Sequence, residues 1–277
     1  MRKVAKKTAL YKKTAELFDV NTYRISNEIS KTENGDKMND KEISIENNTK
    51  TGREENGTPD MSALKLDKRF ETVIYLVRHG QSLGNAKREF LGHTDKDLSE
   101  LGYLQAARTA EFLAYERIDA VYSSSLIRAH NTSLPHAKMR NMPVIDSDEL
   151  KEIYAGAWEG LFVEDIISKY PHEFIDEWRN NFGLSRIPEG EYVPDLAKRI
   201  YNEIYRIAKE NEGRHILIGC HAAAIRSFWG VIAGIRPENL AAELPFPENA
   251  SVSVVYFDGE RLIPGEYSHA AHLLDLL

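Results

Sequence analysis

The sequence predicts an α/β fold of three layers, in which helices cover both faces of a mostly parallel sheet. Two observations predict this class. Short apolar runs rich in β-branched residues recur along the chain after residue 70, and segments with apolar residues at helical spacing lie between them. Alternating strands and helices at this spacing are typical of one α/β domain.

The predicted strands are short, and each has a polar or turn-forming boundary. The first, TVIYLV at 72–77, is an apolar run of the kind expected for a parallel strand buried on both faces. The others lie at 119–124, 143–147, 215–220 and 251–259.

Helices are predicted between these strands. The segment 98–116 repeats apolar residues at helical spacing, and Ser99 is a suitable N-cap for it. The segment 162–182 is expected to be helical on both sides of Pro171. Further helices are predicted at 125–137, 191–210 and 222–234.

The first part of the chain differs in composition from the rest. Apart from a short amphipathic stretch at 4–18, it is rich in Asn, Lys, Glu and Thr and has few residues to bury. Such a segment cannot offset its ordering entropy, so residues 1–65 are predicted to be a disordered or loosely structured extension, followed by one domain at 66–277. An alternative is that translation begins at Met61.

Composition excludes several classes of protein. A net charge of −7, with the acidic excess after residue 60, argues against a nucleic-acid-binding protein. No apolar run approaches the length of about 20 residues that a transmembrane helix needs, and no apolar core of a signal peptide follows the basic start. The single cysteine, Cys220, excludes an internal disulfide and cysteine-rich metal sites. A cytoplasmic protein without a membrane partner is expected.

Charged and imidazole side chains follow three of the predicted strands. LVRHG ends the first strand, SSSLIR follows the second, and GCHAA follows the strand at 215–220. Ligands bind at the carboxyl edge of an open parallel sheet. We therefore expect these segments to meet there, with Gly80 allowing the sharp turn that aims Arg78 and His79 into a crevice.

This combination of residues suits a phosphoryl group. Guanidinium groups match phosphate oxygens and stay charged at physiological pH. A neutral imidazole is a competent covalent nucleophile, and a carboxyl group can protonate the departing alkoxide. Glu149 and Glu152, which follow the third strand, are both candidates for that carboxyl group from spacing alone.

Four segments, in order, resemble the histidine phosphatase superfamily, in its phosphoglycerate mutase-like branch. LVRHGQSLGN resembles the family's Arg-His-Gly-x-Ser-x-x-Asn signature. YSSSLIRAHNTS, ELKEIYAGAWEG and GCHAAAIRSF resemble its arginine, glutamate and second-histidine segments. The resemblance covers residues 72–257 and implies a phosphoglycerate mutase-like fold.

The resemblance also implies roles for individual residues. His79 would accept the phosphoryl group and form a phosphohistidine that water hydrolyses. Arg78, Arg128 and His221 would surround the phosphate, and Glu152 would be the acid and base, since it matches the family's Glu-Ile-x-x-Gly-x-Trp-Glu-Gly position. For Arg128 and His221 the alternatives are a surface arginine and a capping histidine.

Neutral donors complete the implied site. Ser82 and Asn85 would hydrogen-bond the phosphate, although the same residue types could instead cap a following helix. The family uses no metal or other cofactor in this chemistry, and the sequence has no clustered metal-ligand spacing such as HExxH.

We expect a metal-independent phosphatase acting on a small-molecule phosphomonoester. The family's mutases carry an arginine directly after the catalytic glutamate, whereas Ile153 stands there in this chain. Two alternatives stay open: phosphoryl transfer of the phosphoglycerate mutase type, and a catalytically idle module of the same fold that binds phosphate or phosphoproteins. The physiological substrate and the oligomeric state are not predicted.

Overall fold

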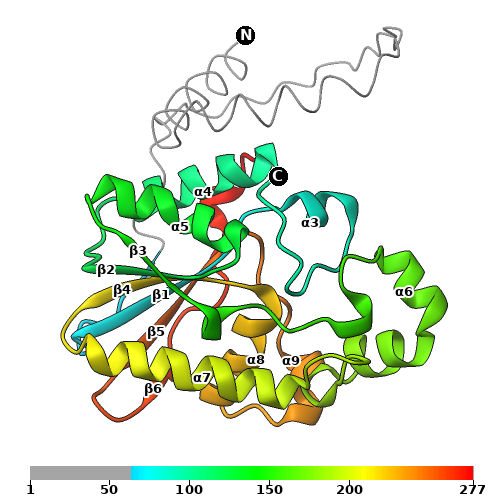
Figure 1. Ribbon diagram of the computed structural model, residues 1–277. Coiled ribbons are helices and arrows are strands. Elements are labelled where there is room, and N and C mark those ends of the chain that lie inside the picture. The colour runs from blue at the N-terminus through cyan, green and yellow to red at the C-terminus, as the bar shows by residue number, and fades with distance from the viewer. Residues whose placement is uncertain (1–63, 277) are drawn as a thin grey trace, which may run out of the picture. The chain divides into compact units, whose positions relative to one another are not determined.

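The computed structural model describes residues 64–276, which contain one six-stranded sheet (Figure 1). Its strands are β1 (Thr72–Arg78), β2 (Ala120–Ser124), β3 (Val144–Ser147), β4 (His215–Cys220), β5 (Val252–Phe257) and β6 (Leu262–Pro264). They lie in the order β3-β2-β4-β1-β5-β6. Residues 1–63, which make up most of the predicted N-terminal extension, lie outside the described part of the chain.

The sheet is parallel on one side and antiparallel on the other. Strands β3, β2, β4 and β1 pair in parallel, whereas β5 is antiparallel to β1 and β6 is antiparallel to β5. The predicted mostly parallel sheet is therefore confirmed. Strand β6 was not predicted, because three residues after a turn are too few to show a period of two.

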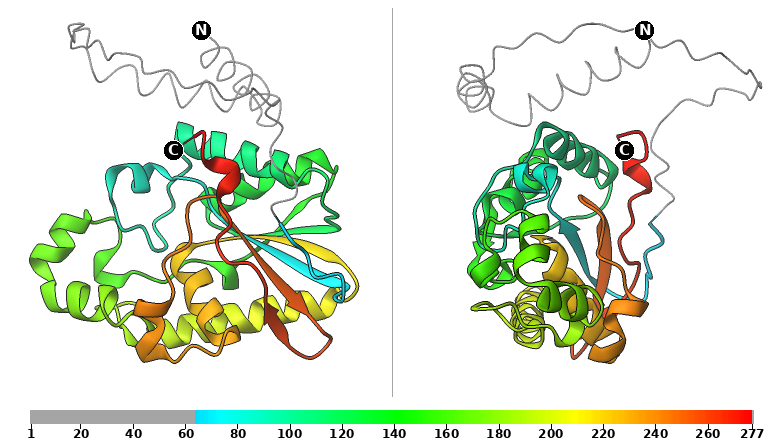
Figure 2. Two further views of the ribbon diagram at one scale, coloured as in Figure 1. Left: turned by 180° about the vertical axis from the view of Figure 1, so that it is seen from behind. Right: turned by 90° about the vertical axis from the view of Figure 1, so that its right-hand side faces the viewer.

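Helices cover both faces of the sheet and complete the predicted three layers. Figures 1 and 2 show α4 and α5 on one face and α7 and α8 on the other. The helices are α3 (Leu83–Lys87), α4 (Glu100–Phe112), α5 (Ile127–Met139), α6 (Val163–Lys169), α7 (Val193–Glu210), α8 (Ala222–Ile232) and α9 (Leu240–Glu243).

Apolar spacing explains how these helices pack. On α7 a stripe repeats every three or four residues and is fully buried; it consists of Leu196, Ile200, Ile204 and Ile207. Ser99 caps α4 as predicted, since its Oγ accepts a hydrogen bond of 3.1 Å from the Gly102 N–H. Strand β1 is buried on both faces from Thr72 to Val77, as its composition predicts.

The segment 162–182 is helical on both sides of Pro171, but the second part is a π-helix. It follows α6 and runs over His172–Arg179, with Pro171 at its N-cap. Phe174 and Trp178 are buried on it. The sequence predicts a helix here but not its type, because apolar spacing over eight residues does not distinguish a π-helix from an α-helix.

Candidate active site

The four segments that carry the predicted site residues meet at the carboxyl edge of the parallel strands. Arg78 is the last residue of β1 and pairs in register with Cys220, the last residue of β4. The next residues along both strands are therefore neighbours, and the His79 N–H donates to the Cys220 carbonyl at 3.0 Å. The ring centroids of His79 and His221 lie 5.2 Å apart.

A single hydrogen bond fixes the tautomer of His79. Its Nδ1 lies 2.7 Å from the carbonyl oxygen of Gly80, which can only accept, so Nδ1 carries the proton. Nε2 then keeps its lone pair. Burial, followed by the charges of Arg128 and Arg78, lowers the pKa of His79 well below its usual value. The imidazole is thus neutral at neutral pH, with one nitrogen free to attack.

Gly80 is required by a close approach of two backbones. A Cβ at this position would lie 2.5 Å from the carbonyl oxygen of Gly102 on α4. The turn after β1 can therefore pack against α4 only with glycine here.

Arg78 and Arg128 line a cavity together with His79, and each is held by backbone carbonyls. Arg78 Nη1 donates to the Pro247 carbonyl at 2.5 Å. Arg128 is buried and donates to the carbonyls of Thr94 at 3.1 Å and Gly92 at 2.7 Å. Burial lowers the pKa of both guanidinium groups, and the charge of Glu152 acts in the opposite direction. Both stay charged, because arginine starts above pH 12.

His221 is fully buried at the N-cap of α8, yet neither of its ring nitrogens has a hydrogen-bond partner. Burial first, and then the charge of Arg128, lowers its pKa well below the usual value. A buried imidazole without a partner is costly unless a ligand supplies one. An anion beside His79 would do so.

The structure separates the two candidate glutamates. Glu152 lines the same cavity as His79, whereas Glu149 is exposed and points its backbone carbonyl at Arg199. The Glu152 carboxylate accepts hydrogen bonds of 3.0 to 3.1 Å from backbone N–H groups of Ile153, Ala223 and Ala224. The last two belong to the first turn of α8, where an anion is favoured.

Glu159 has a structural place in the same loop. One of its carboxylate oxygens accepts from the N–H groups of His93 and Ala155, and the other accepts from both the N–H and the hydroxyl of Thr94. It therefore joins the loop after α3, which holds Arg128, to the loop after Glu152. Gly92 lies against this carboxylate with a φ of +51°, where a Cβ would lie 2.2 Å from Glu159 Oε1.

Ser82 and Asn85 bond each other in a capping box at the start of α3. The Asn85 N–H donates to Ser82 Oγ at 3.0 Å, and the Ser82 N–H donates to Asn85 Oδ1 at 3.1 Å. Asn85 also lines the cavity, but Ser82 does not. The structure thus shows the helix-capping alternative for both residues, and their contact with a phosphate stays a prediction.

A cavity of about 130 Å³ brings the chemistry together. Arg78, His79, Arg128 and Glu152 all line it, as the sequence predicted for one common crevice. Asn85 also lines it, as does Ile153 directly after Glu152, and the rest of its wall comes from residues that the sequence did not indicate: Glu89, Phe90, Leu91, Gly92, Trp178, Ala222, Ala223 and Phe246. They come from four separate segments, so no local motif identifies them.

Arg199 was also missed, although it holds the loop that carries Glu152. It donates to the backbone carbonyls of Glu149 at 2.8 Å, Lys151 at 3.0 Å and Glu152 at 3.2 Å. Its guanidinium also pairs with both oxygens of Glu191. From the sequence, Arg199 is one of several cations on an amphipathic helix, and nothing distinguishes it from its neighbours.

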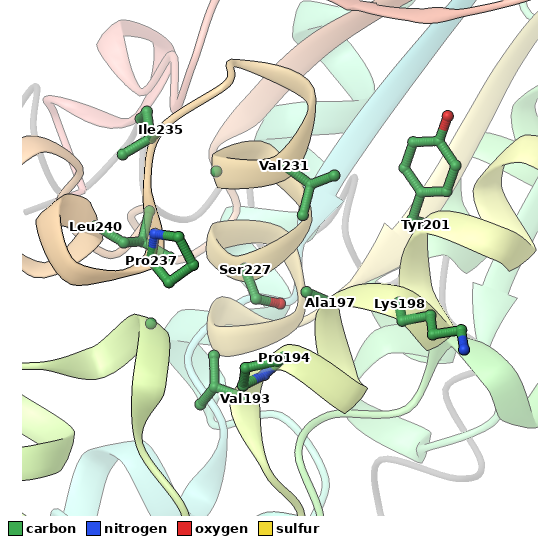
Figure 3. A pocket seen from close by; sticks show the side chains of 12 residues that line it. Val193, Pro194, Ala197, Lys198, Tyr201, Ser227, Val231, Ile235, Pro237 and Leu240 are labelled. Atoms are coloured by element: carbon green, nitrogen blue, oxygen red, sulfur yellow. The ribbon is translucent and has the colours of Figure 1, made fainter.

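A larger cavity, of about 280 Å³, lies away from these residues, between α7 and α8 (Figure 3). Its wall is mainly apolar, with Val193, Ala197, Val231 and Leu240 among its lining residues. Neither His79 nor Arg78, Arg128 or Glu152 lines it. The smaller cavity is therefore the candidate active site.

Two further observations concern residues 64–276. No three His, Cys, Asp or Glu side chains in this range are grouped so that they could hold a metal ion. None of the helices described has both the length and the apolar character needed to cross a membrane.

Comparison with known proteins identifies the family. Residues 74–266 match the model of the histidine phosphatase superfamily (branch 1), and the chain belongs to this family. It is 34% identical to a metal-independent phosphoserine phosphatase of Arabidopsis thaliana, over 73% of this chain and 83% of that protein. It is 30% identical to phosphoserine phosphatase 1 of Hydrogenobacter thermophilus, over 72% of this chain and 93% of that protein.

A phosphoglycerate mutase is among the relatives as well. The 2,3-bisphosphoglycerate-dependent phosphoglycerate mutase 2 of Gloeobacter violaceus is 31% identical over 61% of this chain and 78% of its own length. Among solved structures, the YhfR protein of Bacillus stearothermophilus has a TM-score of 0.69 and 26% identity, covering 73% of this chain and 99% of that one. The predicted phosphoglycerate mutase-like fold is confirmed, and the chain is a histidine phosphatase.

Proposed function

We propose that this enzyme hydrolyses small phosphomonoesters, without a metal, through a phosphohistidine formed on His79. The observation that supports this most strongly is the state of His79: its Nδ1 is bonded to the Gly80 carbonyl, which leaves Nε2 free, and the residue lines a cavity together with two arginines and two glutamates. Relatives named as phosphoserine phosphatases, one of them as metal-independent, support the reaction class.

The first step forms a bond between Nε2 of His79 and phosphorus and breaks the bond between phosphorus and the ester oxygen. Arg78, Arg128 and His221 stabilise the charge on the phosphoryl oxygens in the transition state. Glu152, in its protonated form, donates its proton to the departing alkoxide. The alcohol leaves.

The second step reverses the role of Glu152. Its carboxylate removes a proton from a water molecule, and the water oxygen forms a bond to phosphorus. The bond between phosphorus and Nε2 of His79 then breaks, which releases inorganic phosphate and restores the neutral imidazole. A water molecule is consumed in each cycle, and no oxidant or reductant is needed.

The cavity favours hydrolysis over mutase activity. Within residues 64–276 its only lining cations are Arg78 and Arg128, and the residue after Glu152 is the fully buried Ile153. A bisphosphorylated glycerate would bring a second phosphate and a carboxylate that no further cation would meet. Water is therefore the expected acceptor.

The test is turnover of p-nitrophenyl phosphate with EDTA present. We expect the wild type to release nitrophenol, and His79→Ala to lose activity by about 10³-fold or more, because the nucleophile is removed. His130→Ala is the matched control, since His130 lies on the surface of α5 and pairs with Asp146. Phosphate trapped on the protein should be labile in acid and stable in base.

The outcomes separate the alternatives. Undiminished turnover by His79→Ala would contradict the mechanism. Phosphate binding without any turnover by the wild type would indicate an idle binding module. Conversion of 3-phosphoglycerate in the presence of 2,3-bisphosphoglycerate would indicate a mutase.

The domain boundary and the location of the protein are part of the same proposal. We place the catalytic domain at residues 66–277, which contain the family match at 74–266, and we treat residues 1–65 as an extension that the chemistry does not need. We also propose a cytoplasmic location, supported by the single buried cysteine. Fractionation of cells that express the full chain tests the location.

A further inference from the structure

One side chain in the active-site cavity is not explained by the chemistry at phosphorus. Glu89 follows α3 and lines the cavity together with His79 and Arg128. Its side chain is only 7% exposed, and its Oε2 forms an ion pair with Lys96. Within residues 64–276, its Oε1 has no hydrogen-bond partner. A carboxylate in a small cavity with one oxygen free is a recognition group for a cation.

Three aromatic rings lie in the same wall. Phe90 and Trp178 have ring centroids 5.2 Å apart, and Trp178 and Phe246 have centroids 6.0 Å apart. Each of the three residues lines the cavity. Aromatic faces attract ammonium groups, and the attraction grows as the group loses its water.

The rings are held in place. Arg226, on α8, contacts the rings of both Phe182 and Phe246, with its guanidinium carbon 4.5 and 4.2 Å from their centroids. It donates to the backbone carbonyl of Leu244 at 2.7 Å. The backbone of Phe90 is bonded to the Leu161 carbonyl at 2.8 Å, and its ring packs edge to face with Trp158 at 5.4 Å between centroids. The aromatic wall is therefore preformed.

The charged residues of the cavity determine where the two parts of a substrate bind. The phosphate must lie at His79, with Arg78 and Arg128, so the alcohol portion meets the remaining wall. Among the described residues that wall contributes one carboxylate, Glu89, three aromatic rings and no cation. A carboxylate on the alcohol would meet a like charge, whereas an ammonium group would meet an opposite one.

We propose that the preferred substrates are phosphomonoesters of small amino alcohols, with Glu89 as the residue that selects the ammonium group. The inference rests on the proposed phosphatase function and narrows it to a substrate class. The ammonium group donates to Oε1 of Glu89 and lies against the rings of Phe90, Trp178 and Phe246. Phosphoethanolamine has this chemistry.

The experiment compares kcat/KM for phosphoethanolamine with that for ethyl phosphate, which has the same phosphoester and no ammonium group. We expect the wild type to prefer phosphoethanolamine by about tenfold to a hundredfold, the range of a charge-assisted hydrogen bond. Phosphoserine, which adds a carboxylate, and benzyl phosphate, which offers only a ring, should both be poorer substrates than phosphoethanolamine.

Glu89→Gln should lower the ratio of phosphoethanolamine to ethyl phosphate by about tenfold, since it removes the charge and keeps the shape. The matched control is Lys96→Gln, which breaks the same ion pair but keeps the Glu89 carboxylate. In that variant the ratio should stay the same or rise. A ratio of two substrates does not depend on how much of each variant is active.

Three results would overturn the inference: a wild type that prefers ethyl, benzyl or serine phosphate, a ratio that Glu89→Gln leaves unchanged, or an equal fall in both variants. The wild-type preference is decisive even where a variant does not fold. Failure of the wild type to hydrolyse even p-nitrophenyl phosphate would instead refute the proposed phosphatase function.

Discussion

Buried histidines occur in two regions of this protein, and only one of them has the surroundings of an active site. The first region contains His79 and His221 at the carboxyl edge of the sheet. The second, which we call the C-terminal histidine cluster, consists of His136 on α5 and of His269 and His272 in the last segment of the described chain. Burial lowers the pKa of His136 to about 3 and that of His272 to about 4.

The two regions therefore share buried histidines with a lowered pKa, His79 and His221 in one and His136 and His272 in the other, but differ in what faces them. In the C-terminal histidine cluster, the rings of His269 and His272 stack on Phe112 at 5.2 and 4.4 Å. The nearby Arg140 donates to the backbone carbonyls of His136, Leu113 and Glu116. At His79, by contrast, the arginines and Glu152 line a cavity. A lowered histidine pKa thus reports burial, and the cavity with its cations identifies the site.

Among the substitutions that test this difference between the two regions, Arg128→Gln should change activity the most. Arg128→Gln removes a cation that, in the proposed mechanism, stabilises the phosphoryl oxygens, so kcat/KM should fall by about 10² to 10³-fold. The acid limb of the pH profile should also move to higher pH, because Arg128 lowers the pKa of His79. Steady-state kinetics between pH 4 and pH 9 measure both effects.

Arg140→Gln is the matched control for this change, since Arg140 lies beside His136, a buried histidine of the C-terminal histidine cluster. It should lower the thermal stability and leave kcat/KM within about twofold, because its hydrogen bonds are to backbone carbonyls far from the cavity. Equal losses of activity in both variants would remove the distinction between the two regions.

The second largest effect is expected at Arg199, which we assign as a positioning residue for Glu152. Arg199→Gln removes donors to the carbonyls of Glu149, Lys151 and Glu152, so the acid group should lose its exact placement. We expect kcat to fall by about tenfold to a hundredfold with little change in KM. Partial recovery in Arg199→Lys, without a change in melting temperature, would support positioning over a general loss of stability.

A smaller effect is expected on the pH dependence of the unfolding free energy, through His136 in the C-terminal histidine cluster. The folded pKa of His136 lies below its unfolded value of 6.5, so the unfolded state binds a proton that the folded state does not. Stability should be full above pH 6.5 and fall by about 1.4 kcal/mol per pH unit as the pH drops toward 4.

His136→Phe should remove this contribution and flatten the dependence of unfolding free energy on pH, while phosphatase activity at pH 7 is kept. Denaturant unfolding at several pH values measures it. A slope that does not change in the variant would contradict a neutral His136 in the folded state.

The smallest effect is expected from deletion of residues 1–60. Turnover should stay within about threefold of the full chain, because all residues that line the cavity follow residue 70. A loss greater than tenfold would show that the first 60 residues contribute to the site.

Much of the fold could be predicted because its signals are local. Strand β1 is a continuous apolar run, and α7 repeats buried residues at helical spacing, so both are visible in the sequence. Strand β6 was missed, because three residues show no period. The segment His172–Arg179 was predicted only as a helix, because the wider turn of a π-helix has no distinct sequence pattern.

Some residues of the candidate site could likewise be predicted from the sequence, and others could not. Arg78, His79, Arg128 and His221 lie at or after strand ends, and the rule that ligands bind at that edge brings them together. Trp178 and Phe246 reach the cavity from distant segments through packing alone, so the sequence reads them as ordinary core residues. Ser82 and Asn85 show that one motif can supply a helix cap and a cavity wall together.

The hydrogen bonds from Arg199 to the loop that carries Glu152 have a consequence for redesign of the enzyme's substrate range. Because the wall that carries Glu152 is tied to α7 through three carbonyls, substitutions there should damage the reaction before they change what the enzyme accepts. The wall that includes Glu89 is attached to Arg128 through the carbonyls of Gly92 and Thr94, and not through the side chain of Glu89. A search for variants with new substrate ranges should therefore randomise positions 89, 178 and 246 and leave the segment 149–152 untouched.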